Sequence, residues 1–190
     1  EITIVVPAIL LYTFVSQNGF KLKELIKKSA YYIPPFVLFV LLRFNALGPY
    51  AFGNNETQFI YNPLKFASFG ERISTALKVS YLFIQKLVLP INLSANYYYN
   101  TIKIISSPFH SYQSILGILI LGVLIYLILS RRFRSHIIGI GAAMYFFPYL
   151  VISNLIFTSG DIMGERWAYF PSVGFALLLA YPISKLCKNS

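Results

Sequence analysis

The sequence predicts an all-α, polytopic integral membrane protein with about five transmembrane helices and one interfacial amphipathic helix. Of its 190 residues, 57% are apolar and 12% are charged, whereas soluble domains average about 25% charged residues. So few charges cannot cover the surface of a soluble domain, and the high apolarity also excludes disorder. The net charge of +10 comes from Lys and Arg clustered at the ends of apolar runs, which is typical of membrane orientation signals. We therefore expect the lipid bilayer as a partner and no nucleic acid.

Five apolar runs are the predicted spans of a single membrane domain covering residues 1–190. A helix needs about 20 residues to cross the hydrocarbon core, and the later runs approach that length. The first run is short and has no flank, so we expect its helix to be truncated and the chain to be a fragment that is inactive alone. The basic stretch 16–30 is expected to form a loop. The spans are residues 1–15, 31–47, 114–130, 137–157 and 168–186.

Residues 73–94 are predicted to form an interfacial or re-entrant helix on the outer side. Lys78, Gln85 and Lys86 fall on one helical face, and a Lys at mid-bilayer costs about 2.5–3.5 kcal/mol. An amphipathic helix in the interface carries such residues at little cost. This topology also satisfies the positive-inside rule, whereas a sixth span would divide the basic residues almost evenly. The inner side then holds Lys21, Lys23, Lys27, Lys28, Arg131, Arg132, Arg134, Lys185 and Lys188, and the outer side holds Lys65, Arg72, Lys103 and Arg166.

The outer loops carry most of the acidic residues, and the loop 160–175 is the most informative of them. Glu165 and Arg166 stand at the mouth of the last span, and Tyr169 follows one helical turn after Glu165. A guanidinium at the bilayer edge can bind a lipid phosphate through its fork of donors. Glu165 can hold that guanidinium in place or act as an acid or base. The alternative is a structural Glu–Arg pair that anchors the end of the helix.

Arg43 is a second basic residue near the outer interface. It either snorkels to the headgroups or, if it converges with Arg166, adds a second phosphate contact. The candidate substrate-binding residues are therefore Glu165, Arg166, Tyr169 and Arg43. His110 and His136 are solitary, so we expect no metal site, and a single cysteine excludes an intrachain disulfide. The loop tyrosines fit an interfacial aromatic belt, although aromatic rings also stack on sugars.

Three stretches, which together span nearly the whole chain, carry a family resemblance. The first reads EITIVVPAILLYTF, and the last reads SNLIFTSGDIMGERWAYFPSVGF. The middle one comprises Arg43, Pro49, Asn62-Pro63, Arg72, Thr75-Ala76-Leu77, Tyr81, Leu89-Pro90 and Leu93-Ser94. In this order they resemble the transmembrane-and-tetratricopeptide-repeat O-mannosyltransferases, which are GT-C type glycosyltransferases. One position departs from the family, which often has Asp before an aromatic residue where this chain has Asn96-Tyr97, so we assign Asn96 no catalytic role.

The resemblance implies transfer of a sugar, mannose, from a polyprenyl-phosphate donor to a hydroxyl of a protein or glycan acceptor. The reaction would occur on the extracytoplasmic face of a bacterial inner membrane or of the eukaryotic endoplasmic reticulum. The catalytic carboxylate would lie upstream of this chain, while Arg166 and Arg43 would stabilise the departing lipid phosphate. Whether a divalent metal assists is left open. The residues alone also allow a non-enzymatic polytopic scaffold or a lipid-binding module.

Overall fold

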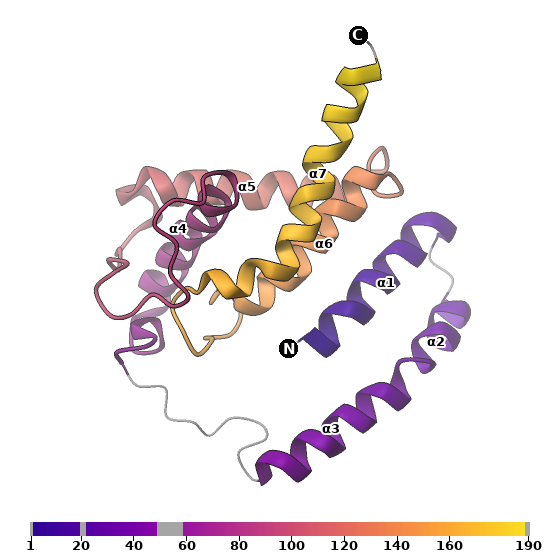
Figure 1. Cartoon of the computed structure of the whole chain (residues 1–190), viewed down its shortest axis with the longest axis horizontal. Helices are drawn as coiled ribbons and strands as arrows, with labels where there is room; N and C mark the ends of the chain where they lie inside the picture. The colour runs from indigo at the N-terminus through magenta and orange to yellow at the C-terminus, as the bar shows by residue number, and fades with distance from the viewer. Residues whose placement is uncertain (1, 20–21, 49–58, 189–190) are drawn as a thin grey trace. The chain divides into compact units, whose positions relative to one another are not determined.

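The computed structural model describes residues 2–19, 22–48 and 59–188 (Figure 1). Within these ranges the chain is helical and forms no strand, and an isolated antiparallel bridge joins Tyr97 and Met163. The predicted all-α class is therefore confirmed. The chain divides into two compact units, residues 1–56 and residues 57–190, which are described separately.

The described residues of the first unit form three helices. They are α1 (Ile2–Asn18), α2 (Leu22–Ala30) and α3 (Ile33–Leu47). Helix α2 corrects the expectation that residues 16–30 form a loop: its Lys, Glu and Leu residues are good helix formers, and α2 contacts both α1 and α3. Pro34 and Pro35 occupy the first turn of α3, where proline is tolerated, and none of the α3 residues is buried.

The described part of the second unit contains four packed helices, with short 3₁₀ turns before α4, between α4 and α5, and before α7. Helix α4 packs on α5, α5 on α6, and α6 on α7, and Figure 1 shows α6 and α7 lying side by side. The helices are α4 (Phe69–Val88), α5 (Tyr112–Leu129), α6 (Ile137–Ile152) and α7 (Tyr169–Lys188). The 3₁₀ turns are η2 (Pro63–Lys65), η3 (Pro108–His110) and η4 (Glu165–Ala168).

Helix α4 is amphipathic as expected, but it begins and ends earlier than the predicted 73–94. It begins after Ser68, whose hydroxyl accepts from the Glu71 N–H while the Glu71 carboxylate accepts from the Ser68 N–H, a capping box. It ends at Val88 because Pro90 disfavours helical geometry at the preceding residue. The buried face of α4 consists of Ser74, Thr75, Ala76, Val79, Ser80 and Phe83.

Two helical segments of the described chain are long and apolar enough to cross a membrane. They are Tyr112–Leu129 and Glu165–Lys188, with mean hydropathies of 2.3 and 1.4. Helices α3 and α6 are apolar but shorter, at 15 and 16 residues. Helix α6 stops at Ile152 rather than at the predicted residue 157, and Asn154 just beyond it takes a left-handed φ of 58°. Five spans and an interfacial α4 remain predictions.

Candidate functional site

Three loop segments of the second unit, residues 59–62, 94–99 and 159–165, meet through backbone hydrogen bonds; we call them the loop layer. The Tyr97 N–H donates to the Met163 carbonyl over 3.0 Å, and the Tyr99 N–H donates to the Ile60 carbonyl over 2.7 Å. The Ile162 N–H donates to the Tyr61 carbonyl over 3.2 Å. Segments far apart in the sequence are therefore held in one fixed register.

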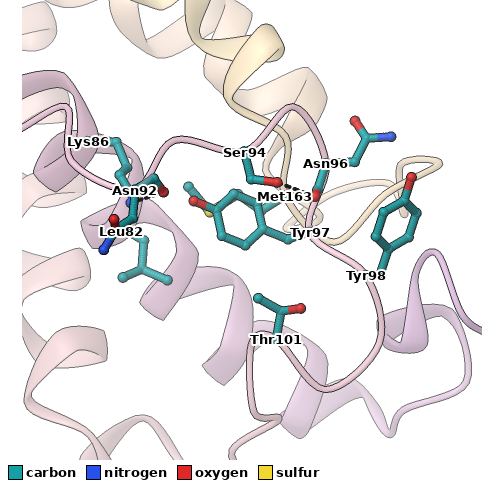
Figure 2. A pocket seen from close by; sticks show the side chains of 9 residues that line it. All are labelled: Leu82, Lys86, Asn92, Ser94, Asn96, Tyr97, Tyr98, Thr101 and Met163. Carbon is teal, nitrogen blue, oxygen red and sulfur yellow. Dashed lines mark hydrogen bonds between the residues drawn. The ribbon is translucent and has the colours of Figure 1, made fainter.

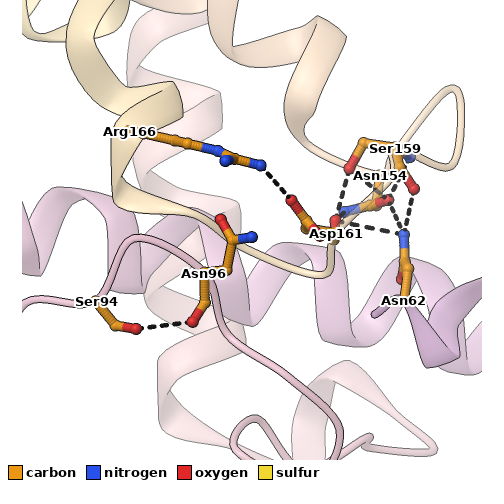
Figure 3. A network of polar contacts seen from close by, with 7 residues as sticks. All are labelled: Asn62, Ser94, Asn96, Asn154, Ser159, Asp161 and Arg166. Atoms are coloured by element: carbon orange, nitrogen blue, oxygen red, sulfur yellow. Dashed lines mark hydrogen bonds and ion pairs between the residues drawn. The ribbon is translucent and has the colours of Figure 1, made fainter. Parts of the chain in front are cut away.

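A buried amide cluster, Asn62 with Asn154 and Ser159, fixes the loop before η4 (Figure 3). The fully buried Asn62 donates from Nδ2 to Asn154 Oδ1 over 2.9 Å and to the Ser159 carbonyl over 2.7 Å. Its Oδ1 accepts from the Leu64 N–H over 3.1 Å. Asn154 in turn donates to the Ile162 carbonyl over 3.1 Å. Buried amides stabilise only when their groups are paired, so this cluster specifies one loop conformation.

Arg166 is positioned by the loop that the amide cluster fixes. Its Nη2 lies 3.0 Å from Asp161 Oδ2, and its guanidinium stacks over the Trp167 ring at 4.9 Å. The Asp161 side chain is 11% exposed and the Arg166 side chain is 54% exposed. The carboxylate partner of Arg166 is thus Asp161, which corrects the expected pairing with Glu165. The result is an oriented guanidinium that still reaches solvent.

Glu165 instead joins η4 to the loop that follows α4. Its carboxylate accepts hydrogen bonds from the Tyr97 hydroxyl and, over 3.1 Å, from the Ser94 N–H. Lys86 Nζ lies 3.8 Å from Glu165 Oε1. Burial, reinforced by the hydrogen bond to Glu165, raises the pKa of the Tyr97 hydroxyl, so Tyr97 remains a donor. Glu165 is therefore placed as a clamp between loops.

A cavity of about 480 Å³ lies beside this clamp; we call it the Tyr97 cavity (Figure 2). Its walls come from the second half of α4, the loop after α4 and the segment before η4. It combines aromatic, amide, hydroxyl and apolar side chains. The lining residues are Leu82, Lys86, Asn92, Ser94, Asn96, Tyr97, Tyr98, Thr101 and Met163.

The structure brings only part of the predicted site together. Glu165 and Arg166 are neighbours in η4 but have different partners. Tyr169 is 74% exposed, and its ring packs against Phe170 at 5.7 Å, so it does not join Glu165. Arg43 belongs to the first unit, where its guanidinium lies 5.9 Å from the Phe39 ring. Its convergence with Arg166 stays a prediction.

Sequence reasoning missed the partners that hold the site. Asp161 and Lys86 were treated as loop and interfacial charges, and Tyr97 as part of an aromatic belt. The Asn62-Pro63 pair was a usable signal, because Asn is a common cap before a Pro-led turn. No sequence signal of comparable strength marked the bond between Asn62 and Asn154.

The comparisons with known proteins find partial relatives. The chain is 35% identical over 57 residues to human protein O-mannosyl-transferase TMTC1, which is 30% of this chain and 6% of that protein. It is 54% identical over 39 residues to Drosophila melanogaster protein O-mannosyl-transferase Tmtc2, which is 20% of this chain and 4% of that protein. Human protein O-mannosyl-transferase TMTC4 is 35% identical over 57 residues, 8% of its length.

The similarity to protein O-mannosyl-transferases therefore rests on short segments, each spanning less than a tenth of the relative's length. No family model matches the chain. No solved structure matches it either. The chain is accordingly similar in part to these transferases, in agreement with the resemblance read from its motifs.

Proposed function

We propose that this chain is part of a membrane glycosyltransferase that transfers mannose from a polyprenyl-phosphate donor to a hydroxyl of a protein or glycan acceptor on the extracytoplasmic face. The observation that carries the proposal is the half-exposed Arg166 guanidinium, oriented by Asp161 and Trp167. The partial similarity to protein O-mannosyl-transferases supports the same reaction class.

The proposed reaction exchanges one carbon–oxygen bond for another at the anomeric carbon of the sugar. The acceptor oxygen forms a bond to the anomeric carbon while the bond between that carbon and the phosphate oxygen breaks. The electron pair of the broken bond leaves with the lipid phosphate. The acceptor proton passes to a general base, which the family resemblance assigns to a carboxylate outside this chain. The acceptor and the donor supply every atom of the product and of the leaving group.

Arg166 has the chemistry to stabilise the departing phosphate. A guanidinium has five N–H donors, and the bond from Nη2 to Asp161 occupies only part of that set. The remaining N–H groups of the guanidinium lie in one plane, in an arrangement that matches the oxygens of a phosphate. Asp161 keeps the fork oriented before the reaction begins, which is the condition under which electrostatic stabilisation is effective.

The other predicted residues take different parts in this proposal. Glu165 is a positioning residue that clamps the loop after α4 to η4. Tyr169 lies exposed at the start of α7, where it can contact the lipid part of a donor. Arg43 contributes a second phosphate contact only in the case that the first unit brings it to Arg166.

The proposal is tested by Arg166→Ala in the full-length protein reconstituted into nanodiscs. Transfer from polyprenyl-phosphate mannose should fall at least about 100-fold, as for loss of a transition-state donor, with membrane insertion unchanged. Arg166→Lys, which keeps the charge but loses the fork, should recover only part of the rate. Arg132→Ala is the matched control, because Arg132 also stacks on a neighbouring ring, 5.5 Å from Phe133. Unchanged transfer in Arg166→Ala would favour a scaffold or lipid-binding role.

The proposed orientation has its own test. In a cysteine-free background with Cys187 replaced by Ser, single thiols from Gly160→Cys and Arg132→Cys should lie on opposite sides of the membrane. Gly160 is exposed, and nothing lies within 4 Å of a side chain added there. A membrane-impermeant maleimide added from the extracytoplasmic side should label the first thiol only. Labelling of both from one side would contradict the orientation.

A further inference from the structure

We propose that the Tyr97 cavity binds a glycosyl ring, a neutral polyhydroxylated ligand, while the phosphate binds separately at Arg166. The inference rests on the proposed function, and it divides the donor site into a sugar part and a phosphate part. The ring can belong to the donor sugar or to an acceptor that already carries a sugar. Both sources present the same chemistry to the cavity.

The charged group in the cavity wall is already occupied, which argues against an anionic ligand. Lys86 donates to the Ile91 carbonyl and, over 2.9 Å, to the Asn92 carbonyl. Its third donor faces the Glu165 carboxylate at 3.8 Å, and an ammonium has only three donors. A phosphate would have to displace two carbonyls and approach a carboxylate, so it is expected to prefer Arg166.

Neutral polar groups of the cavity, in contrast, have unused hydrogen-bonding capacity. The Thr101 and Tyr98 hydroxyls and the Asn92 side-chain amide make no hydrogen bond to the described part of the chain. Asn96 Oδ1 is also enclosed without a donor from the described residues, but Figure 2 shows its side chain turned away from the space between Leu82, Tyr97 and Thr101. Sugar hydroxyls are both donors and acceptors, so a glycosyl ring can pair with those groups that face it.

The remaining wall suits the apolar faces of a sugar ring. Figure 2 shows Leu82, Tyr97 and Thr101 facing a common space, with Met163 completing the lining. An apolar lining with a few placed polar groups is typical of small-molecule sites, and about 480 Å³ lies within their usual range of roughly 300–1,000 Å³. The bond from the Tyr97 hydroxyl to Glu165 fixes the ring at one wall.

The test measures binding of methyl α-D-mannopyranoside to the full-length protein in nanodiscs by saturation-transfer NMR. The double variant Tyr98→Phe/Thr101→Val removes two hydroxyls that have no partner in the described chain, so its fold should be unaffected. The dissociation constant should rise about tenfold, as for the loss of two neutral hydrogen bonds. Tyr99→Phe is the matched control, because Tyr99 is an exposed neighbour that does not line the cavity, and it should leave binding unchanged.

Further arms separate the sources of the ring and the two proposals. Competition of the glycoside with the polyprenyl-phosphate donor assigns the ring to the donor, and competition with a glycosylated acceptor assigns it to the acceptor. Arg166→Ala should retain glycoside binding while it loses transfer. Three results would each overturn the glycosyl subsite. The first is that the parent protein binds no glycoside, and the second is that the double variant keeps the parent's dissociation constant for it. The third such result is displacement of the glycoside by inorganic phosphate in Arg166→Ala. Loss of transfer in Arg166→Ala would still support the proposed function in those cases.

Discussion

The two polar loops that flank α6 differ in how they are held. The loop after α6, residues 153–168, contains buried Asn154, an ion pair and contacts to two other loop segments. The loop before α6, residues 130–136, carries three exposed arginines and is closed by local backbone bonds and by His136, whose Nδ1 accepts from the Ile138 N–H over 3.3 Å. A polar loop becomes a candidate site where buried partners orient its charges, whereas exposed basic residues at the end of an apolar helix are typical of membrane orientation signals.

The loop after α6 keeps its position only if α6 and α7 stay packed together. Gly174→Ala should therefore have the largest effect on it. A Cβ at Gly174 would lie 2.3 Å from the Tyr145 backbone N and 2.6 Å from the Gly141 carbonyl. Backbone atoms cannot move aside as a flexible side chain can, so the helices must separate. The free energy of unfolding in detergent should fall by about 3 kcal/mol, and transfer activity should fall with it.

The matched control is Gly122→Ala in α5. Nothing lies within 4 Å of a Cβ at that position, and Ala favours a helix over Gly by about 1 kcal/mol. This variant should therefore be equally or more stable than the parent. If Gly174→Ala and Gly122→Ala lower the free energy of unfolding equally, close contact between α6 and α7 does not set the stability of this region.

Asn62→Ala tests the buried amide cluster on which the loop after α6 depends. It removes the donor to Asn154 Oδ1 and to the Ser159 carbonyl. Asn154 Oδ1 keeps the Ser159 N–H as a donor, but the buried Leu64 N–H loses its acceptor. Loss of one member of a buried polar network costs about 2 kcal/mol, and Arg166 should lose its orientation. Ser135→Ala in the loop before α6, at an exposed residue, should stay within about 0.5 kcal/mol of the parent. Denaturant unfolding of both variants and their transfer rates measure the contrast.

The approximate positions of the apolar helices were predictable from the sequence, because apolar runs and breakers act locally. The predicted 114–130 and 168–186 correspond closely to α5 and α7. The start of α4 required the Ser68–Glu71 capping box to be recognised. Helix α2 was missed because its basic residues were taken as a sign of a loop rather than of the polar face of a helix.

The partners within the candidate site were not predictable, because they are set by tertiary contact. Arg166 has two acidic residues nearby in the sequence, and spacing alone does not tell which one it meets. The structure selects Asp161, since the Glu165 carboxylate turns to the Ser94 N–H and to Tyr97. Long-range polar pairs such as Asn62 with Asn154, 92 residues apart, leave no periodic signal in the chain.

Tyr97→Phe sharpens the comparison by removing one contact of the clamp without changing its shape. Glu165 loses a hydroxyl donor, so the free energy of unfolding should fall by about 1 kcal/mol. Tyr99→Phe, in the same loop, should have almost no effect. The folded-state pKa of Tyr97 is raised above its ordinary value of 10.0, so its stabilisation is complete below pH 10 and is lost as the pH rises through the folded pKa. If the difference in free energy of unfolding between the parent and Tyr97→Phe stays the same in strong alkali, the Tyr97 hydroxyl is not its source.

The smallest expected effect concerns how α4 begins, beside the loop layer. The hydrogen bonds from the Ser68 hydroxyl and backbone N–H lower the pKa of the Glu71 carboxyl below its ordinary value of 4.5. A carboxyl with a depressed folded-state pKa stabilises the fold above its unfolded pKa, and this contribution is lost as the pH falls through the folded value. Glu71→Gln should therefore melt no more than a few degrees below the parent at pH 7, and the two melting midpoints should converge in acid. A gap that stays constant from neutral pH to pH 3 would assign the effect to the shape of the cap rather than to its charge.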